Sequence, residues 1–385
     1  MNILSLFDGM SCGQIALREL GIKVDKYFAS EIDKHAIAQT QLNFPKTIQL
    51  GSVTEVKATD LPPIDMLIGG SPCQGFSFAG KRAGMSTKQN EEIYTLDRYL
   101  ELKQAGFEFE GQSYLFWEYV RILQELRESN PNVLFLLENV EMGKKWESIL
   151  SDAIGLRGVH INSALVSAQI RKRIYWTNIR TAQTLFGESY TAIPQPKDRG
   201  ILLRDILDDA DVDEKYYLSN KTVQTLHRAR NAEAGNGLTT VAAKDSMIRQ
   251  RPRGNNAGKI YTDKAPTLTA NARQENNLIM ENTAKQINPT RESNNGQQPY
   301  QQNRVYDINH KAPACCATIT GGAYAIADEN APQMRIRRLT PTECARLQTV
   351  PDWYKWKCSN TQQYKMLGNG WTVDVIKHIF KYINQ

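Results

Sequence analysis

The chain has 385 residues, of which 41% are hydrophobic, so it can form one large domain or two moderate ones with real cores. Its net charge of +6 permits a polyanionic partner without requiring one. No apolar run approaches the roughly 20 residues that cross a bilayer, and no basic segment of a secretory signal stands at the start, so we expect no membrane association.

The cysteines and histidines argue against a metal centre. The six cysteines form no C-x-x-C pair, and the five histidines are scattered. A chain that can bury an ordinary core does not depend on a disulfide framework. We therefore expect no metal, reduced thiols and a cytoplasmic protein, and we expect it to be a monomer.

The first 180 residues alternate short apolar runs with helical stretches, which predicts a mostly parallel α/β sheet. Helices are predicted for CGQIALREL at 12–20 and LFWEYVRILQELRES at 115–129. Sheets of this kind bind ligands at the carboxyl ends of their strands, so functional residues are expected there. The predicted strands are NILSLF, KYFASEI, MLIGGS, VLFLLENV, SALVSA and RIYWTNI.

The middle of the chain has a different composition. The polar segment 86–112 is interpreted as an insertion, and a linker follows from Pro194. Residues 220–335 are rich in Asn, Gln, Gly, Arg and Thr. Within them, 258–270 and 303–322 share a Tyr, a Lys-Ala-Pro and a Thr-Leu-Thr or Thr-Ile-Thr, a weak internal repeat. It indicates either two similar hairpins or two recognition elements built from one template.

The last fifty residues regain a helical pattern. Thr340 is a candidate N-cap, with Pro341 at the first helical position and Glu343 at the third, which is a capping-box signature. After this helix, MLGNGWTVDVIKHIFKYI predicts a glycine turn followed by an amphipathic helix.

The first turn, FDGMSCG, places small residues between a strand and a helix, where a ligand can approach the backbone closely. It is not G-x-G-x-x-G, so a dinucleotide site is poorly supported. Glu31 ends the next predicted strand, where a carboxylate can bind ribose hydroxyls. The pattern favours a cofactor that contains a nucleoside but is not bound through a phosphate group. An ordinary tight turn, however, has the same composition.

Three further features carry potential chemistry. Cys73, in GSPCQGFSF, lies in a turn at a strand end, where a thiol can be activated as a nucleophile or be a small core residue. Glu138, in FLLENV, ends a neighbouring strand and suits proton donation, or else caps a helix. Arg171 and Arg173 alternate along one strand, so they share a face that suits phosphate or base contacts, or is simply surface charge.

Together and in this order, these features resemble the C5-cytosine DNA methyltransferase family of bacterial or phage type. The resemblance covers residues 1–180 and 336–380, and a bacterial cell or a phage-infected host is the expected setting. It implies a Rossmann-like methyltransferase sheet with a smaller, mostly β or irregular target-recognition domain. The segments that carry it are LSLFDGMSCGQIAL, ASEIDKHA, GGSPCQGFSFAGKR, FLLENV, QIRKRIYWTNI, RRLTPTECARLQTVPDWY and MLGNGWTVDV.

The resemblance implies that Cys73 adds to C6 of a flipped-out cytosine in double-stranded DNA, that Glu138 supports N3, and that Arg173 contacts the base and its phosphate with support from Arg171. It implies a restriction-modification or solitary enzyme that uses S-adenosyl-L-methionine and releases S-adenosyl-L-homocysteine. The implied cofactor residues are Phe7, Asp8, Gly9, Gly13, Glu31, Ile32, Ser52, Pro72 and Asn369. The expected DNA contacts are Gln74, Ser77, Arg173, Lys264, Thr267, Thr269, Thr318 and Thr320.

The implied domains are a catalytic domain over 1–193, completed by 361–385, and a target-recognition domain over 194–360. The chain departs from the family pattern where Met10-Ser11-Cys12 lengthens the first glycine spacing, where Ser52 replaces an acidic residue, and where GNGWTV ends the last motif. Three alternatives stay open: an RNA cytosine methyltransferase on the same scaffold, a catalytically silent DNA-binding relative, and a dinucleotide-dependent oxidoreductase. The Asn-, Gln- and Arg-rich region favours reading of duplex bases.

Overall fold

The structure is a computed structural model that describes residues 1–72, 85–86, 91–208, 212–216, 246–250, 260–261, 265–266, 277–281, 285–286, 306–307 and 335–383. These residues divide into two compact units. The first lies within Met1–Ile201 and Ala345–Gln385, and the second lies within Leu202–Pro266 and Asn271–Cys344. The first unit therefore extends beyond 1–193 and 361–385, and it includes residues 345–360, which the sequence-based division assigns to the recognition domain.

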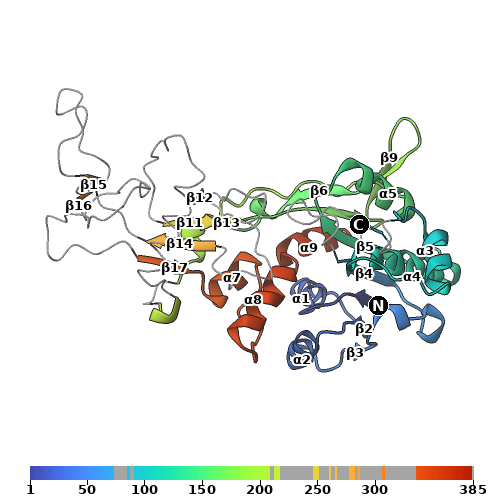
Figure 1. Cartoon of the computed structure of the whole chain (residues 1–385), viewed down its shortest axis with the longest axis horizontal. Helices are drawn as coiled ribbons and strands as arrows, with labels where there is room; N and C mark the ends of the chain where they lie inside the picture. Colours follow the sequence, from blue (N-terminus) through green and yellow to red (C-terminus); the bar gives the residue numbers. More distant parts are fainter. Residues whose placement is uncertain are drawn as a thin grey trace. The chain divides into compact units, whose positions relative to one another are not determined.

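A seven-stranded sheet forms the centre of the first unit, in the order β3-β2-β1-β4-β5-β8-β6 (Figure 1). The strands from β3 to β5 are parallel neighbours, whereas β8 runs antiparallel to both β5 and β6. The predicted mostly parallel α/β sheet is confirmed. Its strands are β1 (Asn2–Leu6), β2 (Lys26–Ser30), β3 (Ile48–Gln49), β4 (Met66–Gly70), β5 (Leu134–Val140), β6 (Val159–Asn162) and β8 (Lys172–Thr177).

One predicted strand is wrong. SALVSA at 163–168 forms a short 3-10 helix, Ser163–Leu165, followed by a bend. The polar side chains explain this, because they bond to neighbours that a sheet ladder would not offer. Asn162 accepts from the amide of Ala164, and the hydroxyl of Ser167 donates to the carbonyl of Leu347. The short strand β7 (Gln169–Ile170) follows the bend.

The helices predicted at 12–20 and 115–129 are confirmed as α1 (Cys12–Glu19) and α4 (Phe116–Ser129). No helix among the described residues is both long and apolar enough to cross a membrane. A hairpin of β9 (Thr181–Gln183) and β10 (Ser189–Thr191) lies beyond the sheet. The other helices in the part of the chain that the structure describes are α2 (Lys34–Asn43), α3 (Leu96–Gln104), α5 (Lys144–Ile154), α7 (Pro341–Leu347), α8 (Asn360–Asn369) and α9 (Val373–Phe380).

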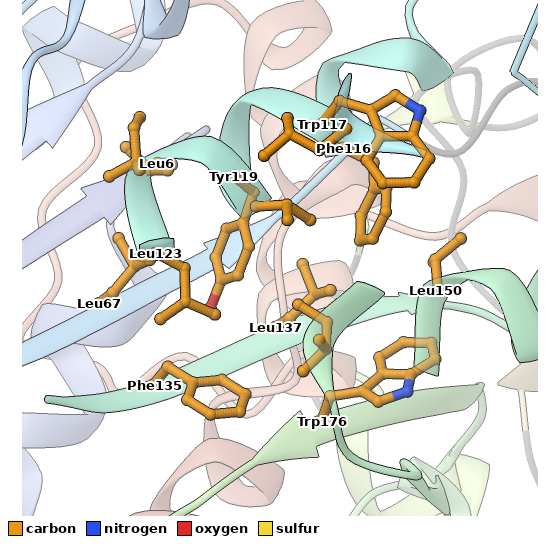
Figure 2. Packing of buried hydrophobic residues seen from close by; sticks show 14 of the residues in the cluster. Leu6, Leu67, Phe116, Trp117, Tyr119, Leu123, Phe135, Leu137, Leu150 and Trp176 are labelled. Atoms are coloured by element: carbon orange, nitrogen blue, oxygen red, sulfur yellow. The ribbon is translucent and has the colours of Figure 1, made fainter. Parts of the chain in front are cut away.

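The main hydrophobic core lies on one face of this sheet, where α4 packs across β4 and β5 (Figure 2). Strand alternation sends every second side chain to this face. Tyr119 and Leu123 of α4 pack above Leu67, and Leu150 of α5 completes the cluster near Trp176 (Figure 2). This packed face fixes the strands whose carboxyl ends carry the candidate site.

The opposite face of the sheet is covered by α1 and α9, which pack against each other. A Cβ at Gly13 would lie 2.4 Å from the Cδ1 of Ile68, so α1 reaches the sheet only because this residue is glycine. In α9, Val373, Ile376 and Ile379 are buried, which confirms the predicted amphipathic helix. The last helix thereby joins the first turn of the chain in one unit.

In the second unit, β12, β11, β14 and β17 form an antiparallel sheet in that order. The predicted capping box is confirmed, because the amide of Thr340 donates to Glu343 at 2.7 Å and the amide of Glu343 donates back at 3.2 Å. Most of the two repeat segments lies outside the described residues, so their interpretation stays a prediction. The elements of the unit are η5 (Leu203–Ile206), η6 (Glu214–Tyr216), β11 (Ser246–Gln250), β12 (Ile260–Tyr261), β13 (Ala265–Pro266), β14 (Asn277–Glu281), β15 (Lys285–Gln286), β16 (Tyr306–Asp307) and β17 (Arg335–Arg338).

Candidate active site

Two of the sequence-predicted catalytic residues, Glu138 and Arg173, meet where β4, β5 and β8 lie side by side. Gly70 at the end of β4 is opposite Glu138 of β5 in the parallel ladder. Arg173 of β8 is opposite Val140 in the antiparallel ladder, and its side chain turns back toward Glu138. Glu138 and Arg173, which were predicted from two motifs 35 positions apart, therefore meet at the carboxyl end of β5.

Glu138 and Arg173 form a close ion pair. The Nε of Arg173 lies 2.9 Å from the Oε1 of Glu138, and the two side chains are only 12% and 10% exposed. The contact lacks the alignment of a hydrogen bond, and Oε1 has no hydrogen-bonding partner among the described residues. A buried, charge-paired carboxylate with an unfilled hydrogen-bonding position is suited to receive a polar ligand.

Asn139 connects this pair to the segment that precedes Cys73. Its amide donates to the hydroxyl of Ser71 at 3.0 Å and to the carbonyl of Ser71 at 3.4 Å, and both residues are buried. Pro72 ends the described segment, while Cys73, Gln74 and Ser77 lie outside the described residues. The link fixes the end of β4 beside Glu138, so the chain enters the Cys73 segment from a defined position.

Arg171 has a different position from the one its pairing with Arg173 suggests. It is 3% exposed, and its guanidinium donates to the carbonyl of Gly368 at 3.3 Å and to that of Gly370 at 2.9 Å. Gln348 donates to the carbonyls of Leu367 and Gly370 as well. Arg171 thus supports the turn between α8 and α9, which agrees with a supporting role and places it away from a direct catalytic one.

That turn packs onto the first turn of the chain. A Cβ at Gly370 would lie 3.2 Å from the Sγ of Cys12 and 3.5 Å from the Sδ of Met10. Asn369, predicted to close the cofactor pocket, is the last residue of α8, directly before this turn. Burial raises the pKa of the Cys12 thiol to about 12, so this thiol stays protonated and acts as a packing group.

The first turn has an unusual backbone. Phe7, Gly9 and Ser11 have φ values of 58°, 57° and 65°, and for the two non-glycine residues such values are strained. The amide of Asp8 donates to the carbonyl of Ser30, and the amide of Gly9 donates to the carboxylate of Glu31 at 2.8 Å. Nothing lies within 4 Å of a Cβ position at Gly9, so the turn presents open backbone.

Glu31 and Ile32 fit an adenosine-bearing cofactor. The carboxylate of Glu31 accepts from the amides of Gly9, Ile32 and Asp33, which orients it at the end of β2. Ile32 is 71% exposed, an apolar side chain left available to a planar ring. An oriented carboxylate, an exposed apolar group and open glycine backbone are the features that ribose and adenine require.

Asp8 and Ser52, two of the predicted cofactor residues, make hydrogen bonds within the chain. The Oδ1 of Asp8 accepts from the hydroxyl of Tyr27 at 2.8 Å, while Oδ2 is buried without a hydrogen-bonding partner among the described residues. Ser52 is the N-cap of a 3-10 helix, where its hydroxyl accepts from the amide of Thr54.

Asp8 predicts a pH-dependent stability. Burial raises its pKa from 3.8 to about 6, so between these values the folded chain retains a proton that the unfolded chain has lost. The free energy of unfolding should therefore fall as the pH rises from about 4 to about 6, by about 3 kcal/mol at 1.36 kcal/mol per pKa unit.

Urea unfolding of the wild type and of Asp8→Asn across this pH range measures the effect. The stability of the variant relative to the wild type should rise by this amount and level off above pH of about 6. Asp60→Asn, at an exposed aspartate, is the control and should show no such trend. A constant difference between Asp8→Asn and wild type would contradict the role of the buried charge.

Sequence reasoning missed several residues of this edge. Asn139, Gln348 and Trp371 join the site through contacts that no motif spacing indicates, although Trp371 stood out as a departure from the family pattern. No group of three or more His, Cys, Asp or Glu side chains that could hold a metal occurs in the part of the chain that the structure describes. Like Gln74 and Ser77, the other predicted DNA contacts apart from Arg173 lie outside the described residues: Lys264, Thr267, Thr269, Thr318 and Thr320.

Comparison with known proteins identifies the class. The family model for C-5 cytosine-specific DNA methylases matches residues 1–385. The orphan methyltransferase M.SPRI of Bacillus phage SPR is 27% identical, over 100% of this chain and 99% of its own length. The type II methyltransferase M.HpaII of Haemophilus parainfluenzae is also 27% identical, over 99% of this chain and 88% of its own.

Two solved structures share the fold. The Dnmt2 methyltransferase of S. pombe has a TM-score of 0.55 at 14% identity, and the DNMT2 of Spodoptera frugiperda has a TM-score of 0.55 at 20% identity. Both comparisons cover 100% of this chain. The chain belongs to the C-5 cytosine-specific DNA methylase family, and it is an enzyme of the DNA (cytosine-5-)-methyltransferase class.

Proposed function

We propose that the enzyme methylates C5 of a flipped-out cytosine in a specific sequence of double-stranded DNA through covalent addition of Cys73. The observation that carries the proposal is the Glu138–Arg173 pair at the sheet edge, which adjoins the Ser71–Pro72 end of the strand that leads to Cys73. A carboxyl group, a guanidinium and a thiol are the groups that this chemistry requires, and Cys73 directly follows Pro72 in the sequence.

In the proposed reaction, the thiolate of Cys73 forms a bond to C6 of the cytosine. The electron pair of the C5–C6 double bond moves toward C5, which becomes nucleophilic. Glu138, in its protonated form, donates a hydrogen bond or its proton to N3, which removes the penalty of a fully anionic ring. After C5 has gained the methyl group, its proton passes to solvent, and the electron pair of the C5–H bond restores the double bond. The bond between C6 and sulfur breaks, Cys73 leaves as the thiolate, and N3 returns its proton to Glu138.

S-adenosyl-L-methionine, when bound, supplies the methyl group as an electrophile. Glu31 and Ile32 would hold its ribose and adenine, and the open backbone at Gly9 would accept its remaining part. Phe7, Gly13, Pro72 and Asn369 are proposed to line the rest of its site. The chain's contribution is to orient these groups and to exclude water from them.

A cytosine inside a duplex cannot reach Cys73, so the target base must leave the stack at a cost of a few kcal/mol. Gln74 and Ser77 are proposed to contact the DNA near the target base, because they follow Cys73 directly. Sequence reading is proposed for the second unit, whose Asn-, Gln-, Arg- and Thr-rich composition suits the edges of adenine and guanine. Lys264, Thr267, Thr269, Thr318 and Thr320 are its proposed contacts.

Transfer of a labelled methyl group tests the proposal. The wild type, incubated with S-adenosyl-L-methionine and sequence-diverse duplex DNA, should label cytosine at C5, and Cys73→Ala should lose transfer while it still binds DNA. Cys358→Ala changes a half-buried cysteine elsewhere and is the matched control. Labelling by Cys73→Ala at the wild-type rate, or a preference for RNA in direct competition, would contradict the proposed nucleophile or the proposed substrate respectively.

A further inference from the structure

Two adjacent glycines end β4, and each lies beneath an aromatic side chain. A Cβ at Gly69 would lie 3.0 Å from the ring of Tyr119, and a Cβ at Gly70 would lie 2.8 Å from the Nε1 of Trp371. Because successive positions of a strand face opposite sides, Tyr119 covers one face of the strand end and Trp371 covers the other. Because residues 69 and 70 have no side chains, an aromatic ring can pack directly against each face of the strand end at the candidate site.

The same point above Gly70 lies close to Glu138. A Cβ there would be 3.1 Å from the Oε2 of Glu138 and 3.4 Å from the Cε2 of Trp371. The indole edge and the carboxylate therefore share the space that a side chain at residue 70 would fill. Since Arg173 approaches the other carboxylate oxygen, the carboxylate of Glu138 has a neighbour at each end.

The position of Trp371 is fixed by the turn that carries it. Its neighbour Gly370 accepts from Arg171 at 2.9 Å, and its other neighbour, Thr372, donates to Gln348 at 2.9 Å. Thr372 also accepts from the hydroxyl of Ser163 at 2.9 Å. The residues on both sides of Trp371 are therefore held by hydrogen bonds, which restricts the movement of the indole away from Gly70.

We propose that Trp371 is a positioning residue for Glu138. The indole edge restricts the rotamers of the carboxylate and excludes water from the side that faces Gly70. A glutamate has three side-chain torsions to fix, and a carboxylate held before the base arrives saves that entropy in the reaction. This inference rests on the proposed function, because it assigns the role of Trp371 through the contact of Glu138 with the base.

Gly70 and Trp371 can be tested as a pair. Gly70→Ala should lower kcat by roughly 10- to 100-fold, because its methyl group displaces both the indole and the carboxylate. Trp371→Leu should lower kcat by a similar factor with KM for DNA nearly unchanged, and Trp371→Phe, which keeps an aromatic wall, should lose less than about 5-fold. In the double variant Gly70→Ala with Trp371→Leu, the smaller side chain removes the clash with the indole but leaves the contact with the carboxylate, so the combined loss of kcat should be smaller than the product of the two single losses.

Trp353→Phe is the matched control, since Trp353 is also half-buried in the first unit but contacts Arg18 and Glu19 instead. It should leave kcat unchanged. Urea midpoints of all variants separate a loss of folding from a loss of positioning. Additive losses in the double variant, or a Trp371→Leu variant that is less stable but transfers methyl groups normally, would overturn the inference.

An emission measurement tests the contact without catalysis. Glu138→Gln should change tryptophan fluorescence in the wild-type background and leave it unchanged in the Trp371→Phe background. The same change in both backgrounds would overturn the proposed proximity. Because this measurement needs no methyl transfer, failure of the proposed function and failure of the positioning role give different results.

Discussion

Glu138→Gln is expected to lower the rate of methyl transfer by roughly 10²–10⁴-fold, the range that a positioned proton donor contributes. Glutamine keeps the shape of the side chain and can donate a hydrogen bond, but it cannot deliver a proton to N3. It also removes the ion pair with Arg173, which has a nitrogen 2.9 Å from the carboxylate. Single-turnover rates with labelled donor, together with the affinities for DNA and donor, measure the effect.

The affinities should change little, because the loss falls on the reaction and only weakly on binding. Glu141→Gln is the matched control, since Glu141 lies three residues further along but is partly exposed and near His160 and Lys172. That variant should react at the wild-type rate. A Glu138→Gln enzyme that also reacts at the wild-type rate would show that another group supports the base.

Arg171→Ala is expected to lower the free energy of unfolding by about 2–4 kcal/mol, because the buried carbonyl of Gly368 loses its guanidinium donor and the half-buried carbonyl of Gly370 loses the shorter of its two side-chain hydrogen bonds. These carbonyls, of Gly368 and Gly370, belong to the turn that packs beside Met10 and Cys12. The affinity for S-adenosyl-L-methionine should therefore fall as well. Arg171→Lys should recover only part of the loss, since an ammonium cannot reproduce the planar fork that reaches both carbonyls.

Urea unfolding and calorimetry with S-adenosyl-L-homocysteine measure the two effects of Arg171. Lys172→Ala, which removes an exposed cation from the adjacent position, is the control and should change neither quantity. If Arg171→Ala keeps full stability but loses methyl transfer, Arg171 acts on the substrate and the supporting role is wrong. The comparison separates the two arginines that sequence periodicity treats alike.

Periodicity along the first 180 residues was sufficient to predict the architecture. Short apolar runs separated by helical stretches identified β1, β2, β4, β5 and β8 and the helices α1 and α4. The capping box at Thr340 and Glu343 could also be predicted, because it is formed by residues three positions apart. Each of these predictions depends on neighbours in the sequence, which is why it could be made from the sequence.

The candidate site could be predicted only in part. Glu138 and Arg173 were identified, and the structure brings them within 2.9 Å of each other. The strand predicted at 163–168 was wrong because Ser167 bonds to Leu347, which lies 180 residues away. A pattern confined to a local window cannot contain such a partner.

The sequence by itself determined the α/β class and the family, because these follow from local periodicity and from motifs in a fixed order, and through the family it predicts the reactive groups. Only the tertiary structure decided that Arg171 supports a turn, that Asn139 fixes the strand before Cys73, and that Trp371 lies over Gly70. The physical reason is that a buried polar group or ring takes its role from whichever partner satisfies its hydrogen bonds and fills its space. That partner is determined by the folded structure and not by the spacing of residues along the chain.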